Sequence, residues 1–281
     1  MSVPLSLFCW KAIGLMVSFR LLSSGTCEIL AIRNHDTTSC TIGGPFVLFA
    51  FRLASLFVVG LVSVLQFVSV GASALCYFTV WNWNLMLAYF FLSSLSSLHA
   101  IRNRDEKKFA NHSNKEQEYA EQLGSVAIID KVVATIFHVL TPMTLFIDVV
   151  TWVVLVPMLL RTPGTEIMLQ YMYSPVGYLQ HGGNAAIMMI EMFLNRIPDS
   201  KWWSHGAVSV WNILFGIWSL AYFLLTGATI YPFLDLGHPQ AWMIHISLFF
   251  SGIFASYLIQ YILYMKKCWC FSPAKTRNKS L

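Results

Sequence analysis

The stretch that decides the fold is Tyr178–Asn195, YLQHGGNAAIMMIEMFLN, which is largely apolar yet carries the polar side chains of His181, Asn184 and Glu191. Each of these is costly to bury without a hydrogen-bond partner. His181, Asn184, Met188 and Glu191 are spaced three, four and three residues apart. With this spacing they lie on one face of a helix. Lipid cannot satisfy that face, so we expect it to line a helix interface or a cavity.

Composition indicates the class of protein around this stretch. Charged residues make up 11% of the 281 positions and apolar types 57%, whereas soluble domains contain roughly a quarter charged and slightly under half apolar residues. The mean hydropathy is +0.62, and several apolar runs approach the ~20 residues that cross a bilayer as a helix. The sequence therefore predicts an all-α polytopic integral membrane protein, a six-helix transmembrane bundle.

Six apolar runs are predicted to span the membrane, and they leave no room for a separate soluble domain. They cover approximately residues 53–70, 81–100, 132–160, 173–194, 206–229 and 241–265. The predicted organisation is a cytosolic N-terminal segment (1–44), a six-span domain (45–265) with a cytosolic loop at 101–131, and a basic cytosolic tail (266–281). A further apolar run at 5–22 contains Lys11 and Arg20, which a lone span tolerates poorly, so it is predicted to be an interfacial helix.

The distribution of positive charge predicts the orientation. Of the 18 Lys and Arg residues, all but Arg161 fall on the side of the predicted bundle that holds both termini, and the positive-inside rule puts that side in the cytosol. Glu191, near the cytosolic end of its span, is expected to reach interfacial water or Arg196. Span length fits an endomembrane such as the endoplasmic reticulum as well as the plasma membrane.

Cofactors and nucleic acid are not expected. The net charge of +5 is explained by membrane topology, and no Arg-rich or zinc-type motif accompanies it. No metal site is predicted, because no two of His181, His245 and Asp148 are close enough in the sequence to form a local ligand pair. The cysteines fall mostly on the predicted cytosolic side and are expected to be reduced.

Four candidate functional residues gather toward the predicted luminal ends of the spans. Thr79 begins the second span, Asp148 lies in the third, and His181 and Asn184 lie at the head of the fourth. We expect all four to wall a polar cavity that opens toward the lumen or exterior. Each also has a structural interpretation, because interhelical hydrogen bonds alone account for polar residues within a bundle.

Five motifs, in this order, resemble the androgen-induced and rolling stone superfamily of six-span membrane proteins, particularly its plant members. They are FRLASLF (51–57), YFTVWNWNLMLAYFFLSSLSSL (77–98), DVVTWVVLVP (148–157), HGGNAAIMMIEMFLN (181–195) and IYPFLDL (230–236). The resemblance runs from roughly Phe51 to Met265, and it implies the six-span fold.

The animal androgen-induced branch of this family implies an activity. Its members resemble intramembrane hydrolases in which a threonine and a histidine cleave fatty acid esters of hydroxy fatty acids, and Thr79 matches the position of the threonine nucleophile. That branch carries a His-Gly-x-His motif whose second histidine is catalytic. Here the matching run is His181-Gly182-Gly183-Asn184, so asparagine occupies that position.

The resemblance thus implies a hydrolase hypothesis and leaves an alternative. In the hypothesis, Thr79 attacks a lipid ester, His181 serves as base, Asn184 stabilises the oxyanion and Asp148 orients the site. The alternative, similar to the rolling stone branch with its implied role in muscle-cell fusion, is a non-catalytic protein that binds lipid or packs against the helices of a membrane-protein partner. Membrane lipids are expected partners in both cases.

Overall fold

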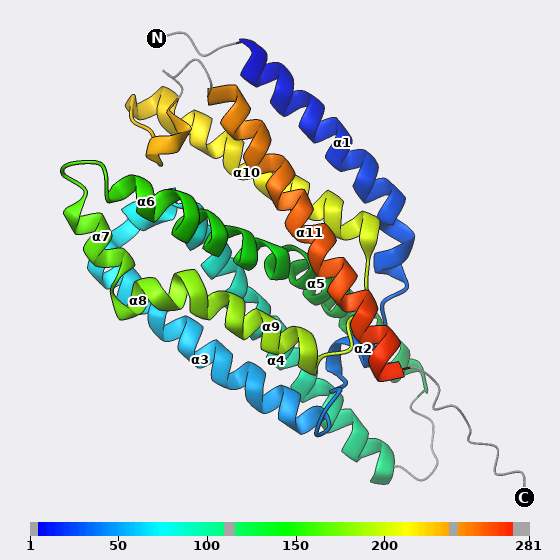
Figure 1. The fold of residues 1–281 in the computed structure, drawn as a ribbon. Helices are drawn as coiled ribbons and strands as arrows, with labels where there is room; N and C mark the ends of the chain where they lie inside the picture. Colours follow the sequence, from blue (N-terminus) through cyan, green and yellow to red (C-terminus); the bar gives the residue numbers. More distant parts are fainter. Residues whose placement is uncertain (1–4, 110–115, 236–240, 272–281) are drawn as a thin grey trace, which may run out of the picture.

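The computed structural model describes residues 5–109, 116–235 and 241–271, and the regular structure within these ranges is helical (Figure 1). Six of the described helices are long and apolar enough to cross a membrane, which confirms the predicted all-α multi-pass class. These six segments are Cys9–Leu30, Pro45–Cys76, Phe78–Asn103, Ile128–Leu159, Lys201–Thr226 and Trp242–Trp269.

The helices follow one another with short connections. The α-helices are α1 (Leu5–Leu30), α2 (Asn34–Thr38), α3 (Pro45–Val70), α4 (Phe78–Phe109), α5 (Glu116–Val149), α6 (Val156–Leu159), α7 (Glu166–Met172), α8 (Pro175–Tyr178), α9 (Asn184–Leu194), α10 (Lys201–Thr226) and α11 (Ala241–Phe271). Two 3-10 segments, Gly71–Cys76 and Pro232–Leu234, and two π-helical turns, Val150–Leu155 and Leu179–Gly183, complete the described structure.

Proline and glycine mark the ends of the long helices. Pro45 opens α3, where a missing backbone N–H is harmless, and Gly71 follows its last residue with φ 72°. Gly227, also at φ 72°, ends α10 and donates its N–H to the carbonyl oxygen of Phe223. The chain therefore reverses direction within a few residues of each long helix.

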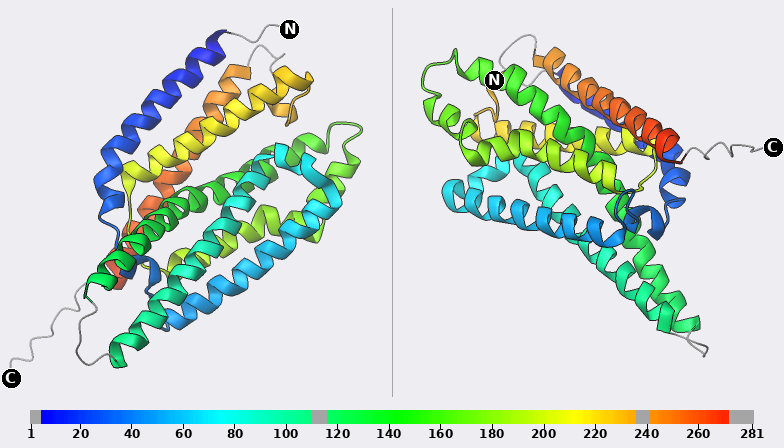
Figure 2. Two further views of the ribbon diagram at one scale, coloured as in Figure 1. Left: turned by 180° about the vertical axis from the view of Figure 1, so that it is seen from behind. Right: turned by 60° about the horizontal axis from the view of Figure 1, so that its bottom comes forward.

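The long helices lie side by side and alternate in direction (Figure 1, Figure 2). Helix α10 packs against α1, α5 and α11, while α4 packs against α3 and α5. We call the end of the bundle that holds residues 71–77, 160–174 and 230–235 the cavity end. The opposite end, which holds residues 31–44, 195–200 and 266–271, is called the charged end.

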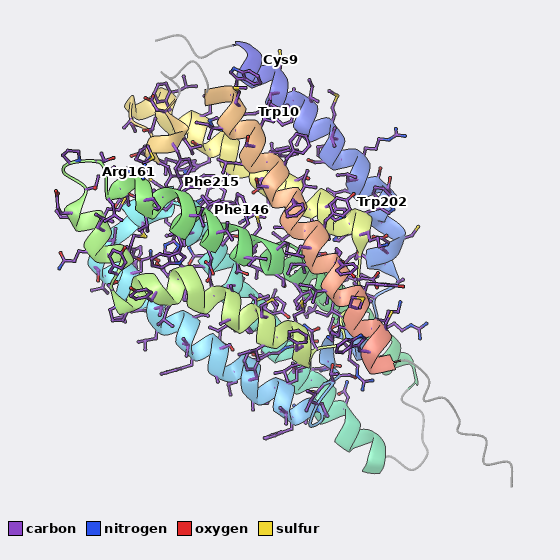
Figure 3. The ribbon with its side chains drawn as sticks, in the orientation of Figure 1. Cys9, Trp10, Phe146, Arg161, Trp202 and Phe215 are labelled. Atoms are coloured by element: carbon purple, nitrogen blue, oxygen red, sulfur yellow. The ribbon has the colours of Figure 1, made fainter. Side chains whose placement is uncertain are left out.

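The interior is filled by apolar side chains in two clusters, one centred on α3, α4, α5 and α9 and the other on α5, α10 and residues 230–234. Phe146 and Phe215 lie between α5 and α10 in the second cluster, whereas Arg161 lies at the tip of the cavity end (Figure 3). Both phenylalanines are buried and Arg161 is exposed.

The N-terminal helix differs from the interfacial helix predicted for it. Helix α1 lies along α10 at the edge of the bundle (Figure 2), and it has the length and composition of a membrane span. Glycines permit the close packing, because a Cβ on Gly25 would overlap the backbone of Trp203, and one on Gly206 would lie 2.6 Å from the backbone nitrogen of Leu22. The sequence argument counted Lys11 as a charge facing lipid, whereas it lines a cavity inside the bundle.

The added helix changes the placement of the chain ends. The first described residue, Leu5, lies at the cavity end and the last, Phe271, at the charged end (Figure 1). The arrangement therefore differs from the predicted one, in which both termini are on one side. Residues 110–115 of the predicted cytosolic loop and residues 272–281 of the predicted tail lie outside the described ranges, while α4 and α5 extend up to Phe109 and from Glu116.

The predicted fourth span is present as a broken helix. Helices α8 and α9 are joined by the π turn Leu179–Gly183, in which His181 has the non-helical backbone angles φ −125° and ψ 31°. The predicted polar face is nevertheless confirmed, because His181, Asn184, Met188 and Glu191 are all buried, with 0–3% of their surface exposed. This broken segment is not one of the six long apolar helices. The structure therefore has six such helices, as predicted, but α1 takes the place of the predicted fourth span among them.

A buried ion pair joins α3 to α9 near the charged end. The side chains of Arg52 and Glu191 are fully buried, and Nη2 of Arg52 lies 2.6 Å from Oε1 of Glu191. Tyr89 donates its hydroxyl to the same oxygen at 2.7 Å, and Arg52 donates to the Ser97 hydroxyl at 2.7 Å. Glu191 is therefore held inside the bundle, and its predicted contact with interfacial water or Arg196 was wrong.

Candidate functional site

Thr79 lies in the first turn of α4 and is held there by a residue distant in sequence. The hydroxyl of Tyr231 accepts the backbone N–H of Phe78 at 3.0 Å and lies beside the Thr79 side chain. Burial raises the pKa of Tyr231 to about 12, although the hydrogen bonds from Phe78 and Thr79 act in the opposite direction. The phenol is therefore neutral at physiological pH and retains a proton that it can donate.

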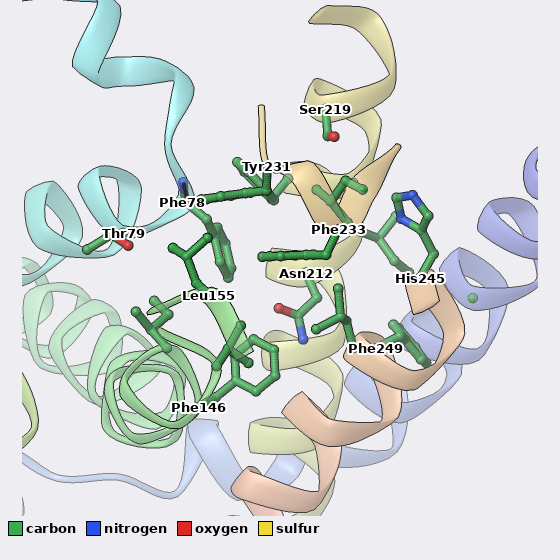
Figure 4. Close-up of a pocket in the computed structure, with 18 of the residues that line it drawn as sticks. Phe78, Thr79, Phe146, Leu155, Asn212, Ser219, Tyr231, Phe233, His245 and Phe249 are labelled. Atoms are coloured by element: carbon green, nitrogen blue, oxygen red, sulfur yellow. Dashed lines mark hydrogen bonds between the residues drawn. The ribbon is translucent and has the colours of Figure 1, made fainter. Parts of the chain in front are cut away.

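Two adjoining chambers occupy the cavity end. One, which we call the Gln180 chamber, has a volume of about 440 Å³, and the other, the Lys11 chamber, about 100 Å³. Thr79, Leu155 and Tyr231 line both and form the boundary between them. Most of the remaining lining is aliphatic and aromatic, with Phe78 and Leu155 directed into the Lys11 chamber (Figure 4). Such a lining suits an apolar ligand with a few polar groups.

His181 lines the Gln180 chamber but is bonded to a threonine other than Thr79. Its Nδ1 lies 3.0 Å from Oγ1 of Thr151, and its backbone carbonyl accepts the indole N–H of Trp152. The two π turns meet here, since Thr151 and Trp152 belong to Val150–Leu155 and His181 to Leu179–Gly183. The His181 ring is therefore fixed in orientation by Thr151, with its other nitrogen available for chemistry.

Asp148 and Asn184 lie apart from the chambers. Their side chains are neighbours, and neither residue is among the described residues that line either chamber. Asn184 also accepts the backbone N–H of Ala185 at 2.8 Å, while one carboxylate oxygen of Asp148 is buried with no hydrogen-bond partner in the described part of the chain. The structure thus brings Thr79 and His181 to one chamber and leaves Asp148 and Asn184 as a neighbouring pair.

Several lining residues were missed by the sequence analysis. Gln66 and Gln180 form a hydrogen bond of 2.8 Å, and Tyr171 donates to Gln180 and accepts from Gln66. Gln66 lies deep in the apolar run of α3, and that unsupported polar residue was a signal for an inward-facing site. Thr151 gave no comparable signal, because its contact with His181 depends on the two π turns.

Among the described residues, no group of three or more His, Cys, Asp or Glu side chains is arranged to hold a metal ion. Comparison of the chain with protein-family models, curated proteins and solved structures gives no match.

Proposed function

We propose that this chain is a multi-pass membrane protein that takes a lipid ester into the two chambers and hydrolyses it with Thr79 as nucleophile. The observation that supports this best is the position of Thr79 at the boundary of both chambers, where the central ester of a two-chain molecule would lie. The chemistry is that of a threonine hydrolase acting within the bundle. The family resemblance, which rests on motifs alone, points in the same direction.

The proposed steps use groups that line the cavity. Nδ1–H of His181 donates to Thr151, which leaves Nε2 as the base. Nε2 takes the proton of Thr79, directly or through a water, as the Thr79 oxygen bonds to the ester carbonyl carbon. The carbon–oxygen bond to the alcohol then breaks, and the alcohol leaves with the proton from His181. Water cleaves the acyl-threonine by the same route and releases the acid.

The oxyanion role is reassigned in this proposal. Asn184 points into its own helix turn and toward Asp148, whereas the neutral phenol of Tyr231 lies beside Thr79. We propose that Tyr231 donates to the oxyanion, and that Asp148 and Asn184 support the helix packing around His181.

The proposed orientation follows from charge. The described charged end carries Arg33, Arg102, Lys131, Lys201 and Lys267, whereas the cavity end carries Lys11 and Arg161. The positive-inside rule then supports a charged end in the cytosol and a cavity end toward the lumen of the endoplasmic reticulum or the cell exterior.

Covalent labelling tests the proposal. Purified full-length protein is treated with a fluorophosphonate probe, and Thr79→Ala is expected to abolish labelling, while His181→Gln slows it by about 10²-fold or more. Thr165→Ala is the matched control, because Thr165 lines the same chamber but donates its hydroxyl to the Leu159 carbonyl at 2.7 Å. Equal labelling of wild type and folded Thr79→Ala would refute the assignment of the nucleophile.

A second candidate is a non-catalytic lipid-binding protein. It is favoured by one observation: in the described structure the His181 ring is hydrogen-bonded to Thr151 instead of Thr79, so the proposed base has another partner. Saturable binding of a lipid ester without labelling or hydrolysis would support this candidate.

A further inference from the structure

The Lys11 chamber contains a cation that the proposed hydrolysis does not use. Lys11 extends from α1 toward α10, where Gly216 makes room for it, since a Cβ on Gly216 would lie 2.5 Å from the lysine Nζ. Lys11 is one of the residues that line the chamber, and none of the described lining residues is acidic. An ammonium group in apolar surroundings is expensive to maintain without an anion.

Further donors lie on the walls around this cation. His245 comes from α11, and its Nε2 is buried with no hydrogen-bond partner in the described part of the chain. Asn212 comes from α10, and its carboxamide nitrogen is buried and unpartnered in the same way. Figure 4 shows His245 on the side of the chamber nearest α1 and Asn212 nearer its middle. Three elements thus supply a cation and two polar side chains, with no carboxylate among the described lining residues.

Most of the remaining lining of the chamber is apolar. Trp10 packs edge-on against Phe249 with ring centroids 5.5 Å apart, and Phe146, Phe215 and Phe233 complete the aromatic wall. An aromatic wall of this kind accommodates a hydrocarbon chain, and the remaining polar lining residues, Thr79, Thr151, Ser219 and Tyr231, carry no charge. The combination of one cation with apolar walls matches a single-chain amphiphile that has an anionic head group.

We infer that the Lys11 chamber is a binding site for the carboxylate of a long-chain fatty acid, with Lys11 as counter-ion, His245 and Asn212 as further polar contacts, and the acyl chain directed past Leu155. The volume of about 100 Å³ favours a small planar carboxylate over a bulkier phosphate head group. The inference rests in part on the proposed function, because an acid bound here would place its chain toward Thr79 and would be either a substrate carboxylate or the released product.

Equilibrium binding measured without turnover separates this inference from the hydrolase proposal. Full-length protein carrying Thr79→Ala, reconstituted in phosphatidylcholine nanodiscs, is titrated with radiolabelled palmitate, and unlabelled hexadecanol and palmitoyl lysophosphatidate serve as competitors. Saturable palmitate binding is expected, with hexadecanol at least about ten-fold weaker because it lacks the charge. Palmitate binding in a protein that shows no probe labelling at Thr79 would leave this inference standing while the hydrolase proposal fails.

Variants assign the head group to the chamber. Lys11→Met is expected to weaken palmitate binding at least about ten-fold and to leave hexadecanol binding within about two-fold, since it keeps the length of the side chain and removes the charge. Arg161→Met is the matched control, because Arg161 is an exposed cation at the same end of the bundle and outside both chambers. Thermal unfolding of each variant establishes that it is folded.

Two results would overturn the inference. Unchanged palmitate affinity in folded Lys11→Met would show that the chamber is only an apolar pocket. Stronger competition by lysophosphatidate than by palmitate, lost in Lys11→Met, would show that the anion is a phosphate and that the carboxylate assignment is wrong.

Discussion

The two ends of the bundle differ in whether a charge inside the protein has a partner of opposite charge. At the charged end, the guanidinium of Arg52 is fully buried and is met by the carboxylate of Glu191 and by neighbouring hydroxyls. At the cavity end, Lys11 and His245 line a chamber with no acid among its described lining residues. A charge that is satisfied within the fold supports the structure, whereas a charge left without a partner in a cavity indicates a ligand.

The largest expected effect tests the charged end. Glu191→Leu leaves Arg52 buried without its counter-ion, and we expect it to destabilise the protein by about 3–5 kcal/mol. Thermal unfolding in detergent measures this, with Glu166→Gln as the control because Glu166 is the exposed first residue of α7. A loss of less than about 1 kcal/mol would contradict the conclusion that the buried ion pair at the charged end supports the structure.

The next effect concerns the close packing of α1 against α10. Gly25 of α1 lies against the backbone of Trp203, so an added methyl group cannot be relieved by rotating a side chain. Gly25→Ala is expected to destabilise the protein by about 1–3 kcal/mol. Gly182→Ala is the control, because a Cβ there meets nothing within 4 Å. Similar unfolding midpoints for the two variants would contradict close packing of α1 on α10.

A smaller effect, of opposite sign, is expected at the cavity end. Lys11→Met removes an unpaired ammonium from the apolar chamber, so the ligand-free protein should gain about 1 kcal/mol of stability. The same unfolding assay, run after removal of co-purified lipid, measures the gain. Destabilisation by Lys11→Met would mean that Lys11 already has a structural partner, and the two ends would then no longer differ.

The smallest effect is expected at an exposed ion pair, and it provides a reference for the other changes in stability. Lys267 and Asp199 form an ion pair at the charged end with 3.9 Å between Nζ and Oδ1, and the lysine is 62% exposed. Lys267→Ala should change stability by no more than about 0.5 kcal/mol, because solvent screens the pair. A change as large as that of Glu191→Leu would show that the unfolding assay reports net charge instead of buried contacts.

The fold was largely predictable because its main determinants are hydropathy and helical periodicity. The all-α membrane class and the buried face of α9 were both predicted correctly, since each depends only on which residues are apolar and how they are spaced. The N-terminal helix was predicted to be interfacial because composition gives the number of charges but not the direction in which each side chain points. Lys11 faces inward to a cavity, and a lysine counted as facing lipid argues wrongly against a span.

The candidate site was predictable only in part. Thr79 and His181, expected in one cavity, both line the Gln180 chamber. Asn184 and Asp148 were expected in the same cavity, yet they lie beside each other outside it. The regular helix assumed in the sequence analysis carries no π turn, and each such turn rotates the residues beyond it away from their expected direction.

The two π turns also determine how the bundle responds to changes in chain length. A π turn amounts to a one-residue insertion in an α-helix, and removal of one residue from Val150–Leu155 would rotate one half of that helix against the other by about 100°. Thr151 would then turn away from His181 although no residue of the site had been substituted. The contact between Thr151 and His181 therefore depends on the rotation of one part of the helix relative to the other. We expect single-residue deletions in these two turns to alter the site more than most substitutions of residues that line the chambers.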